Sequence, residues 1–169
     1  MGCSCGTSKE LSANGEQCTV IIIDHEEYEA RYGRQKPVVM FPIRGQSDVT
    51  LTRHLVDEYL KERLSLWKDP SRARILLALT EAVTNVVKHT PGGALSVYID
   101  AVGPRFHVID RGKGLHPDCP MCKFFRKGFS TTASLGAGFF VMMQYFREIV
   151  LCTSSRGTKL VLCSDLKSG

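Results

Sequence analysis

The spacing of apolar residues along this chain switches from a helical period to a strand period, and then switches in the same way again. Between residues 48 and 66, apolar side chains fall on one helical stripe, at Leu51, Leu55, Tyr59, Leu60 and Leu64. A second, more apolar helix is expected to begin at Asp69-Pro70, because Asp69 can cap it and proline suits its first turn. It should end near His89, before Pro91-Gly92-Gly93.

From residue 95 the apolar residues recur at every second position, which is the spacing of a strand. Strands are predicted at 95–101 and 105–110, a helix at 136–147, and a closing hairpin at 148–153 and 158–163. This order lacks the strict strand–helix alternation of a parallel, doubly wound sheet. It predicts an α+β fold: a two-layer sandwich with a mostly antiparallel sheet and helices on one face.

The N-terminal part carries weaker signals. Residues 1–18 look like a loose tail with few apolar anchors, and 19–23 form a β-branched run typical of a strand. One short helix is expected within 24–36, and a strand at 38–43, where Pro42 favours a sheet edge. We therefore divide the chain into an extension, 1–37, and a main domain, 38–165.

Composition limits the classes of protein that the chain can represent. Its 169 residues, 43% of them hydrophobic, suffice for one domain with a core. No apolar run approaches the roughly 18–20 residues that span a bilayer, and no leader is recognisable, so we expect a cytoplasmic protein without a membrane partner. The net charge of +5 comes without a dense Lys/Arg run, which argues against nucleic acid and suits a phosphate-bearing ligand or an acidic protein.

The second predicted helix carries Glu81 and Asn85 on one face, with His89 a further turn along and Lys88 near that face. A carboxylate and an amide on an apolar helix are costly unless something satisfies them. A hydrated Mg²⁺ would do so, and Glu81 could act as a general base. The alternative is an ordinary solvated stripe of an amphipathic helix.

A second candidate site follows the strand at 105–110. Alternation places Asp110 on the same side as Phe106 and Val108, and an inward carboxylate needs a donor, such as an adenine amine. Gly112 and Gly114 would let the backbone approach a ligand closely. The alternative is a tight turn.

Glycines and hydroxyls form a third candidate site. Gly136 and Gly138 open a helix, whose free N–H groups favour an anion, and Ser130 and Thr131 add hydroxyl donors just before it. The alternative is a flexible loop with a helix cap. Gly157-Thr158 alone indicates only a hairpin turn.

The seven cysteines are an odd number, so at least one is unpaired within the chain. His116, Cys119 and Cys122 lie within seven residues and could bind zinc or sense redox conditions, although a structural zinc site needs four ligands. The third interpretation is that Cys119 and Cys122 have no functional role. Cys152 and Cys163 fit small core residues.

Taken in order, Glu81-x-x-x-Asn85, Asp110-x-Gly112-x-Gly114, Gly136-x-Gly138 and Gly157-Thr158 resemble the GHKL (Bergerat-fold) ATPase superfamily of gyrase, Hsp90, histidine kinases and MutL. The resemblance covers 38–165. Within the superfamily the chain is similar to the anti-sigma-factor serine/threonine kinases of bacterial partner-switching systems, especially the RsbT-like switch kinases. Two segments carry this finer likeness, 47–54 and 135–139.

The resemblance implies ATP and Mg²⁺ as cofactors and a role for each matched residue. Glu81 would be the general base, Asn85 a Mg²⁺ ligand, and Asp110 the partner of the adenine amine. The remaining implied ATP contacts are the adenine-pocket residues Gly112, Gly114 and Thr158, and the phosphate-binding residues Lys88, Gly136 and Gly138, under a lid formed by 116–135.

The implied function is a protein kinase that phosphorylates a serine or threonine of a STAS-domain antagonist or scaffold protein. The alternative is an anti-sigma factor that sequesters a sigma factor, with ATP as a conformational ligand. The resemblance leaves a homodimer open. The close switch kinases are shorter, so it assigns no role to residues 1–37, and Phe139-Phe140 stand where the family often has a proline.

Overall fold

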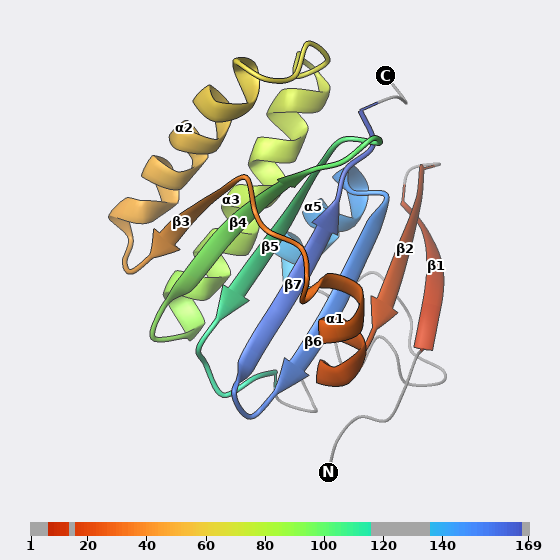
Figure 1. Cartoon of the computed structure of the whole chain (residues 1–169), viewed down its shortest axis with the longest axis vertical. Coiled ribbons are helices and arrows are strands. Elements are labelled where there is room, and N and C mark those ends of the chain that lie inside the picture. Colours follow the sequence, from red (N-terminus) through yellow and green to blue (C-terminus); the bar gives the residue numbers. More distant parts are fainter. Residues whose placement is uncertain (1–6, 14–15, 116–135, 167–169) are drawn as a thin grey trace.

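The computed structural model describes residues 7–13, 16–115 and 136–166 (Figure 1). Seven strands form one sheet in the order β1-β2-β6-β7-β5-β4-β3. Neighbouring strands are antiparallel except β2 and β6, which run parallel. The strands are β1 (Thr7–Ala13), β2 (Glu16–Ile22), β3 (Val39–Ile43), β4 (Gly93–Ile99), β5 (Pro104–Asp110), β6 (Glu148–Ser154) and β7 (Gly157–Cys163). The described helices are α1 (His25–Tyr32), α2 (Ser47–Lys61), α3 (Ser71–His89) and α5 (Gly136–Tyr145).

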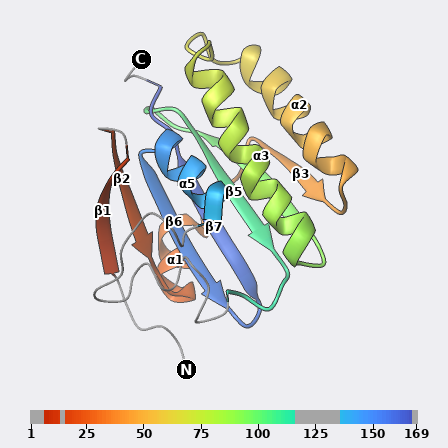
Figure 2. The same cartoon turned by 180° about the vertical axis from the view of Figure 1, so that it is seen from behind.

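Alternating residues of the central strands form the floor of the core. The rows that face the helices are Phe106 and Val108 of β5, Leu160 and Leu162 of β7, and Ile149 and Leu151 of β6, all buried. The helices α2, α3 and α5 cover this face, as Figure 2 shows from behind. The predicted α+β sandwich is thus confirmed.

The apolar residues by which α2 packs on the core differ in part from the predicted stripe. Its core-facing residues include Val49, Val56 and Leu60, whereas Leu51 and Leu55 are exposed. The helix also ends at Lys61, earlier than the predicted residue 66. Leu60 of the predicted stripe is buried, and Tyr59 and Leu64 pack partly against the core, so the prediction is wrong only for Leu51 and Leu55.

The short helix α1 lies on the opposite face of the sheet (Figure 1). Tyr28 of α1 is buried there with Val150, Cys152, Val161 and Cys163, in a second, smaller apolar cluster. The predicted layer of three helices is therefore joined by one short helix on the other side.

Beneath α1 lies His107, which is fully buried. Arg105 Nε donates to His107 Nε2 at 3.2 Å, so the neutral ring carries its proton on Nδ1, 2.8 Å from the Tyr28 hydroxyl. Burial lowers the pKa of His107 to about 3, helped by the positive charges of Arg105 and Lys159. His107 therefore links Arg105 of β5 to Tyr28 of α1 inside the second apolar cluster.

The prediction of a loose tail over 1–18 is wrong for residues 7–13 and 16–18. These residues pair as β1 and β2, and β2 joins β6, where Cys18 and Val20 are buried. A polar outer strand is stabilised by backbone pairing, which leaves little trace in hydrophobic spacing. Residues 1–6 lie outside the described part, and the domain boundary after residue 37 stays a prediction.

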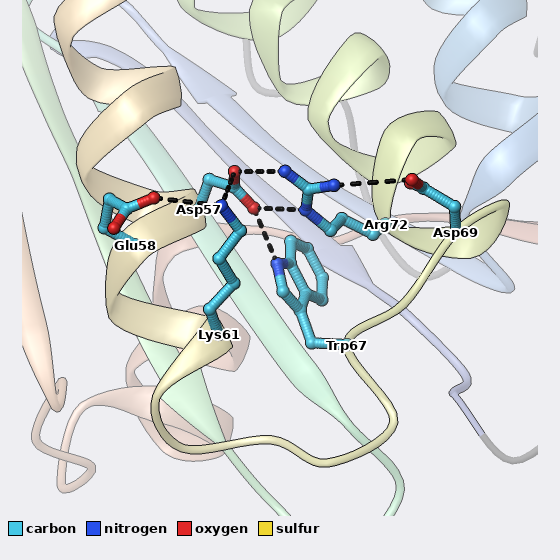
Figure 3. A network of polar contacts seen from close by, with 6 residues as sticks. All are labelled: Asp57, Glu58, Lys61, Trp67, Asp69 and Arg72. Carbon is cyan, nitrogen blue, oxygen red and sulfur yellow. Dashed lines mark hydrogen bonds and ion pairs between the residues drawn. The ribbon is translucent and has the colours of Figure 1, made fainter.

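Asp69 does not cap α3. The N-cap position is Pro70, without a side-chain cap bond, and Asp69 instead pairs with Arg72 at 3.4 Å. The chief anchor of the α2–α3 connection is Asp57, which accepts hydrogen bonds from Arg72 Nε and from the buried Trp67 indole (Figure 3). Proline already supplies a suitable φ at the helix start, so the aspartate is not needed there.

At the other edge of the sheet, β3 is the outermost strand, as Pro42 suggested. In the part of the chain that the structure describes, no helix is both long and apolar enough to span a membrane.

Candidate functional site

Three polar side chains end the apolar rows of three adjacent strands. Asp110 follows Phe106 and Val108 on β5, and it lies next to Thr158 of β7, whose backbone N–H donates to its Oδ1 atom at 3.2 Å. Thr158 pairs across the β6–β7 hairpin with Thr153. By strand alternation all three lie on the helix-covered face, at one end of the sheet.

Asp110 is held as a hydrogen-bond acceptor. Besides the Thr158 amide, its Oδ1 atom receives the Gly112 N–H at 2.8 Å, which closes the turn after β5. No described residue donates to its second oxygen, Oδ2, so the carboxylate keeps an acceptor for a ligand. The sequence predicted this inward carboxylate and its need for donors.

Close backbone approach explains the neighbouring glycines. Gly157 has φ +130°, and a Cβ there would lie 2.2 Å from the Asp110 carbonyl oxygen. Gly114 has φ +77°, and a Cβ there would lie 2.1 Å from the Ser154 carbonyl oxygen. Side chains at either position would force the hairpin away from the turn after β5.

Thr153 is the member of this group that sequence reasoning missed. Its hydroxyl accepts the Leu115 N–H at 2.8 Å and lies 3.1 Å from the Thr158 hydroxyl. The available signal was the hairpin register, because a turn at 154–157 places residue 153 opposite 158.

The end of α3 borders the same turn. Thr90 Oγ1 donates to the Val86 carbonyl at 2.8 Å and accepts the Gly92 N–H at 3.2 Å. A Cβ on Gly112 would lie 3.0 Å from the Thr90 methyl group. The glycine turn therefore packs directly against the C-terminus of α3.

Glu81 of α3 meets α5 at a glycine. A Cβ on Gly138 would lie 2.9 Å from Glu81 Oε2, so the missing side chain leaves room for this carboxylate. Gly138 belongs to the first turn of α5, whose N–H groups have no partner within the helix. Asn85 and Lys88 follow Glu81 along α3, and both are exposed.

Other predicted residues lie outside the described part: Ser130, Thr131, the lid 116–135, and the possible zinc or redox residues His116, Cys119 and Cys122. Gly136 begins α5. Among the residues that the structure describes, no three His, Cys, Asp or Glu side chains form a metal site. Cys152 and Cys163 are buried as predicted, with free thiols, and burial raises the pKa of Cys163 to about 12.

The site fits a nucleotide. A carboxylate oxygen and a threonine hydroxyl, both beside glycines, suit a purine base, and the amide-rich start of α5 suits phosphates. The side-chain amide oxygen of Asn85 is of the kind that Mg²⁺ accepts as a ligand.

Comparison with protein families supports this interpretation. Residues 71–168 match the family described as histidine kinase-, DNA gyrase B-, and HSP90-like ATPase. The match spans more than half of the chain and includes every residue from Glu81 to Thr158 discussed above. No curated protein matches the chain significantly. The chain therefore belongs to the histidine kinase-, DNA gyrase B- and HSP90-like family of ATP-binding domains.

Proposed function

We propose that this protein is an ATP-dependent serine/threonine kinase of a partner-switching system, and that its substrate is a STAS-domain protein. Membership of the ATPase family supports nucleotide binding. The finer assignment rests on the likeness of segments 47–54 and 135–139 to the switch kinases.

The observation that carries the proposal is the contact between Glu81 and Gly138. It places a half-buried carboxylate beside the first turn of α5, where helix N–H groups favour a phosphate. A general base for phosphoryl transfer must lie near the transferred group and near an incoming hydroxyl. Glu81 is the carboxylate that meets this requirement in the described part of α3.

The proposed roles of the other residues follow their places. Asp110 and Thr158 would hold the adenine base, Asn85 would ligate Mg²⁺, and exposed Lys88 would contact phosphate. ATP supplies the phosphoryl group, and Mg²⁺ offsets the negative charge on the phosphates. Glu81 would take the proton of the serine or threonine hydroxyl as the hydroxyl oxygen bonds to the γ-phosphorus, and the bond from that phosphorus to the bridging oxygen would break to release ADP.

Binding of Mg-ATP to the purified chain, measured by calorimetry, tests the nucleotide site. Asp110→Asn and Asn85→Ala should each weaken binding at least tenfold, roughly the worth of one charge-assisted contact. Asp100→Asn is the matched control, because Asp100 also accepts two backbone N–H groups, at 2.9 and 3.2 Å, but in the β4–β5 turn. Absence of binding by the folded wild type would refute the proposal.

Transfer of labelled phosphate from ATP to purified STAS-domain proteins tests the kinase assignment. Glu81→Gln should lower the transfer rate by about 10²–10⁴-fold, the usual contribution of a general base, and leave ATP binding nearly unchanged. The exposed Glu62→Gln is the control. A chain that binds ATP and retains a sigma factor, but transfers no phosphate, would instead support the anti-sigma alternative.

A further inference from the structure

We propose that Thr153 is a positioning residue that orients the Thr158 hydroxyl as a hydrogen-bond donor, and thereby makes the site prefer adenine to guanine. The inference rests on the proposed roles of Asp110 and Thr158 at the base. Thr153 itself need not touch the ligand.

The direction of the hydrogen bonds follows from counting protons. Leu115 N–H can only donate, so it occupies one lone pair of Thr153 Oγ1, at 2.8 Å. The Thr153 hydroxyl has one proton, and among the described residues its hydrogen-bonding neighbour besides Leu115 is Thr158 Oγ1, at 3.1 Å. Donation from Thr153 to Thr158 satisfies Thr153 fully. The reverse direction would leave its proton without an acceptor in the described part.

The chain of bonds therefore runs from Leu115 through Thr153 to Thr158, and it leaves the Thr158 proton for the next group. Bonds that point in one direction along such a chain strengthen one another. Thr158 is nearly buried, with 9% of its surface exposed, so few acceptors compete for this proton.

The next group lies beside Asp110, because the Thr158 backbone N–H donates to Asp110 Oδ1. The site thus presents the Oδ2 acceptor of Asp110 next to the hydroxyl donor of Thr158. Adenine offers an amine donor next to a ring-nitrogen acceptor on its Watson–Crick edge, and guanine offers a carbonyl acceptor next to an N–H donor. The donor–acceptor order of the site matches adenine and opposes guanine.

The backbone around Thr153 holds the Thr153 and Thr158 hydroxyls in one arrangement. The β6–β7 register places Thr153 directly opposite Thr158, and the turn between them closes on Gly157. Gly114 brings the chain within contact of Thr153, since a Cβ there would lie 2.9 Å from the Thr153 hydroxyl oxygen. The backbone therefore holds the Leu115 amide within hydrogen-bonding distance of the Thr153 hydroxyl.

Calorimetry of the full chain with Mg-ATP and Mg-GTP tests the proposal. Thr153→Val keeps the shape but removes the hydroxyl, and it should weaken ATP binding roughly fivefold, about the worth of one neutral hydrogen bond. GTP binding should stay the same or tighten, so the ATP/GTP affinity ratio falls at least fivefold. Thr153→Ser should restore the wild-type ratio. Thr19→Val is the control, a half-buried strand threonine beside the other end of β6.

An unchanged ATP/GTP affinity ratio in Thr153→Val would overturn the inference while leaving the proposed function intact. If the ratio is unchanged because both affinities fall equally, Thr153 only holds the hairpin. A folded wild type that binds neither nucleotide would remove the proposed function as well.

A measurement without nucleotide checks the first bond of the chain. Hydrogen exchange of the Leu115 amide should be slow in the wild type and in Thr153→Ser, and about tenfold faster in Thr153→Val. Equal protection in all three proteins would overturn the proposed orientation, because Leu115 would then not depend on the Thr153 hydroxyl.

Discussion

Replacing Asp57 by asparagine should lower the free energy of unfolding by about 2 kcal/mol, and Figure 3 shows why. The Asp57 side chain is 11% exposed, and its carboxylate accepts hydrogen bonds from two guanidinium nitrogens of Arg72, both at 2.6 Å, and from the Trp67 indole at 2.9 Å. Asparagine would keep one acceptor and turn an NH₂ group toward Arg72. This predicted loss is smaller than the 3–5 kcal/mol expected when one partner of a fully buried ion pair is removed, because the Arg72 side chain is 26% exposed.

The effect of Asp57→Asn should depend on pH. Hydrogen bonds from Arg72 hold the pKa of the Asp57 carboxyl well below its ordinary value of 3.8, with further bonds from Trp67 and Lys61 acting against desolvation. A lowered folded-state pKa stabilises the fold above the unfolded-state pKa, and this contribution is lost as the pH falls through the folded-state pKa. The difference between wild type and variant should therefore be full at pH 7 and shrink below about pH 4.

Urea unfolding followed by fluorescence measures this difference directly, because Trp67 is the only tryptophan of the chain and is buried. With a slope of about 2 kcal/mol per molar urea, the midpoint should fall by about 1 M. The control Glu58→Gln removes an exposed partner of Lys61 and should shift stability by less than about 0.5 kcal/mol. A midpoint unchanged by Asp57→Asn, or a difference that grows in acid, would refute the reasoning.

Three further predictions concern the site and the opposite face. Gly138→Ala should keep or slightly raise the melting temperature, since alanine favours helix, but should slow phosphate transfer about 10²-fold by displacing Glu81; normal transfer would contradict the proposed role of that contact. Tyr28→Phe should cost about 1–2 kcal/mol in urea unfolding, because it removes the buried hydrogen bond to His107. His107, whose folded-state pKa of about 3 lies below its ordinary 6.5, should make stability fall as the pH drops from about 6.5 toward 3, and His107→Gln should remove that slope.

The elements with strong periodicity were predictable from the sequence, and those held by pairing were not. The span of α3 and the rows of β5, β6 and β7 follow from helical and strand spacing, because burial of one face imposes the period. The hairpin of β1 and β2 was missed because β1 carries mostly polar residues. Its stability depends on a partner strand far along the chain, which local spacing does not record.

The residues of the candidate site likewise fall into those that the sequence could predict and those that it could not. Asp110 and Thr158 belong to short motifs in which glycines mark close approach, so sequence reasoning could find them. Thr153 carries no motif of its own and gains its place from the hairpin register and from Leu115. The contact between Glu81 and Gly138 joins residues on two helices, and only the packing of α3 against α5 reveals it.

The two carboxylates of the site differ in their surroundings, and this difference supports different roles. Asp110 receives two backbone N–H groups on one oxygen, which fixes its orientation and commits it to accepting hydrogen bonds. Among the described residues none donates to Glu81, whose carboxylate lies against the bare backbone of Gly138. A carboxylate held by two amides keeps its second oxygen in one direction, which suits recognition of a donor on a ligand. Glu81 lies beside the first turn of α5, where a phosphate would bind, so in the proposed mechanism its place suits the group that takes the proton of the incoming hydroxyl.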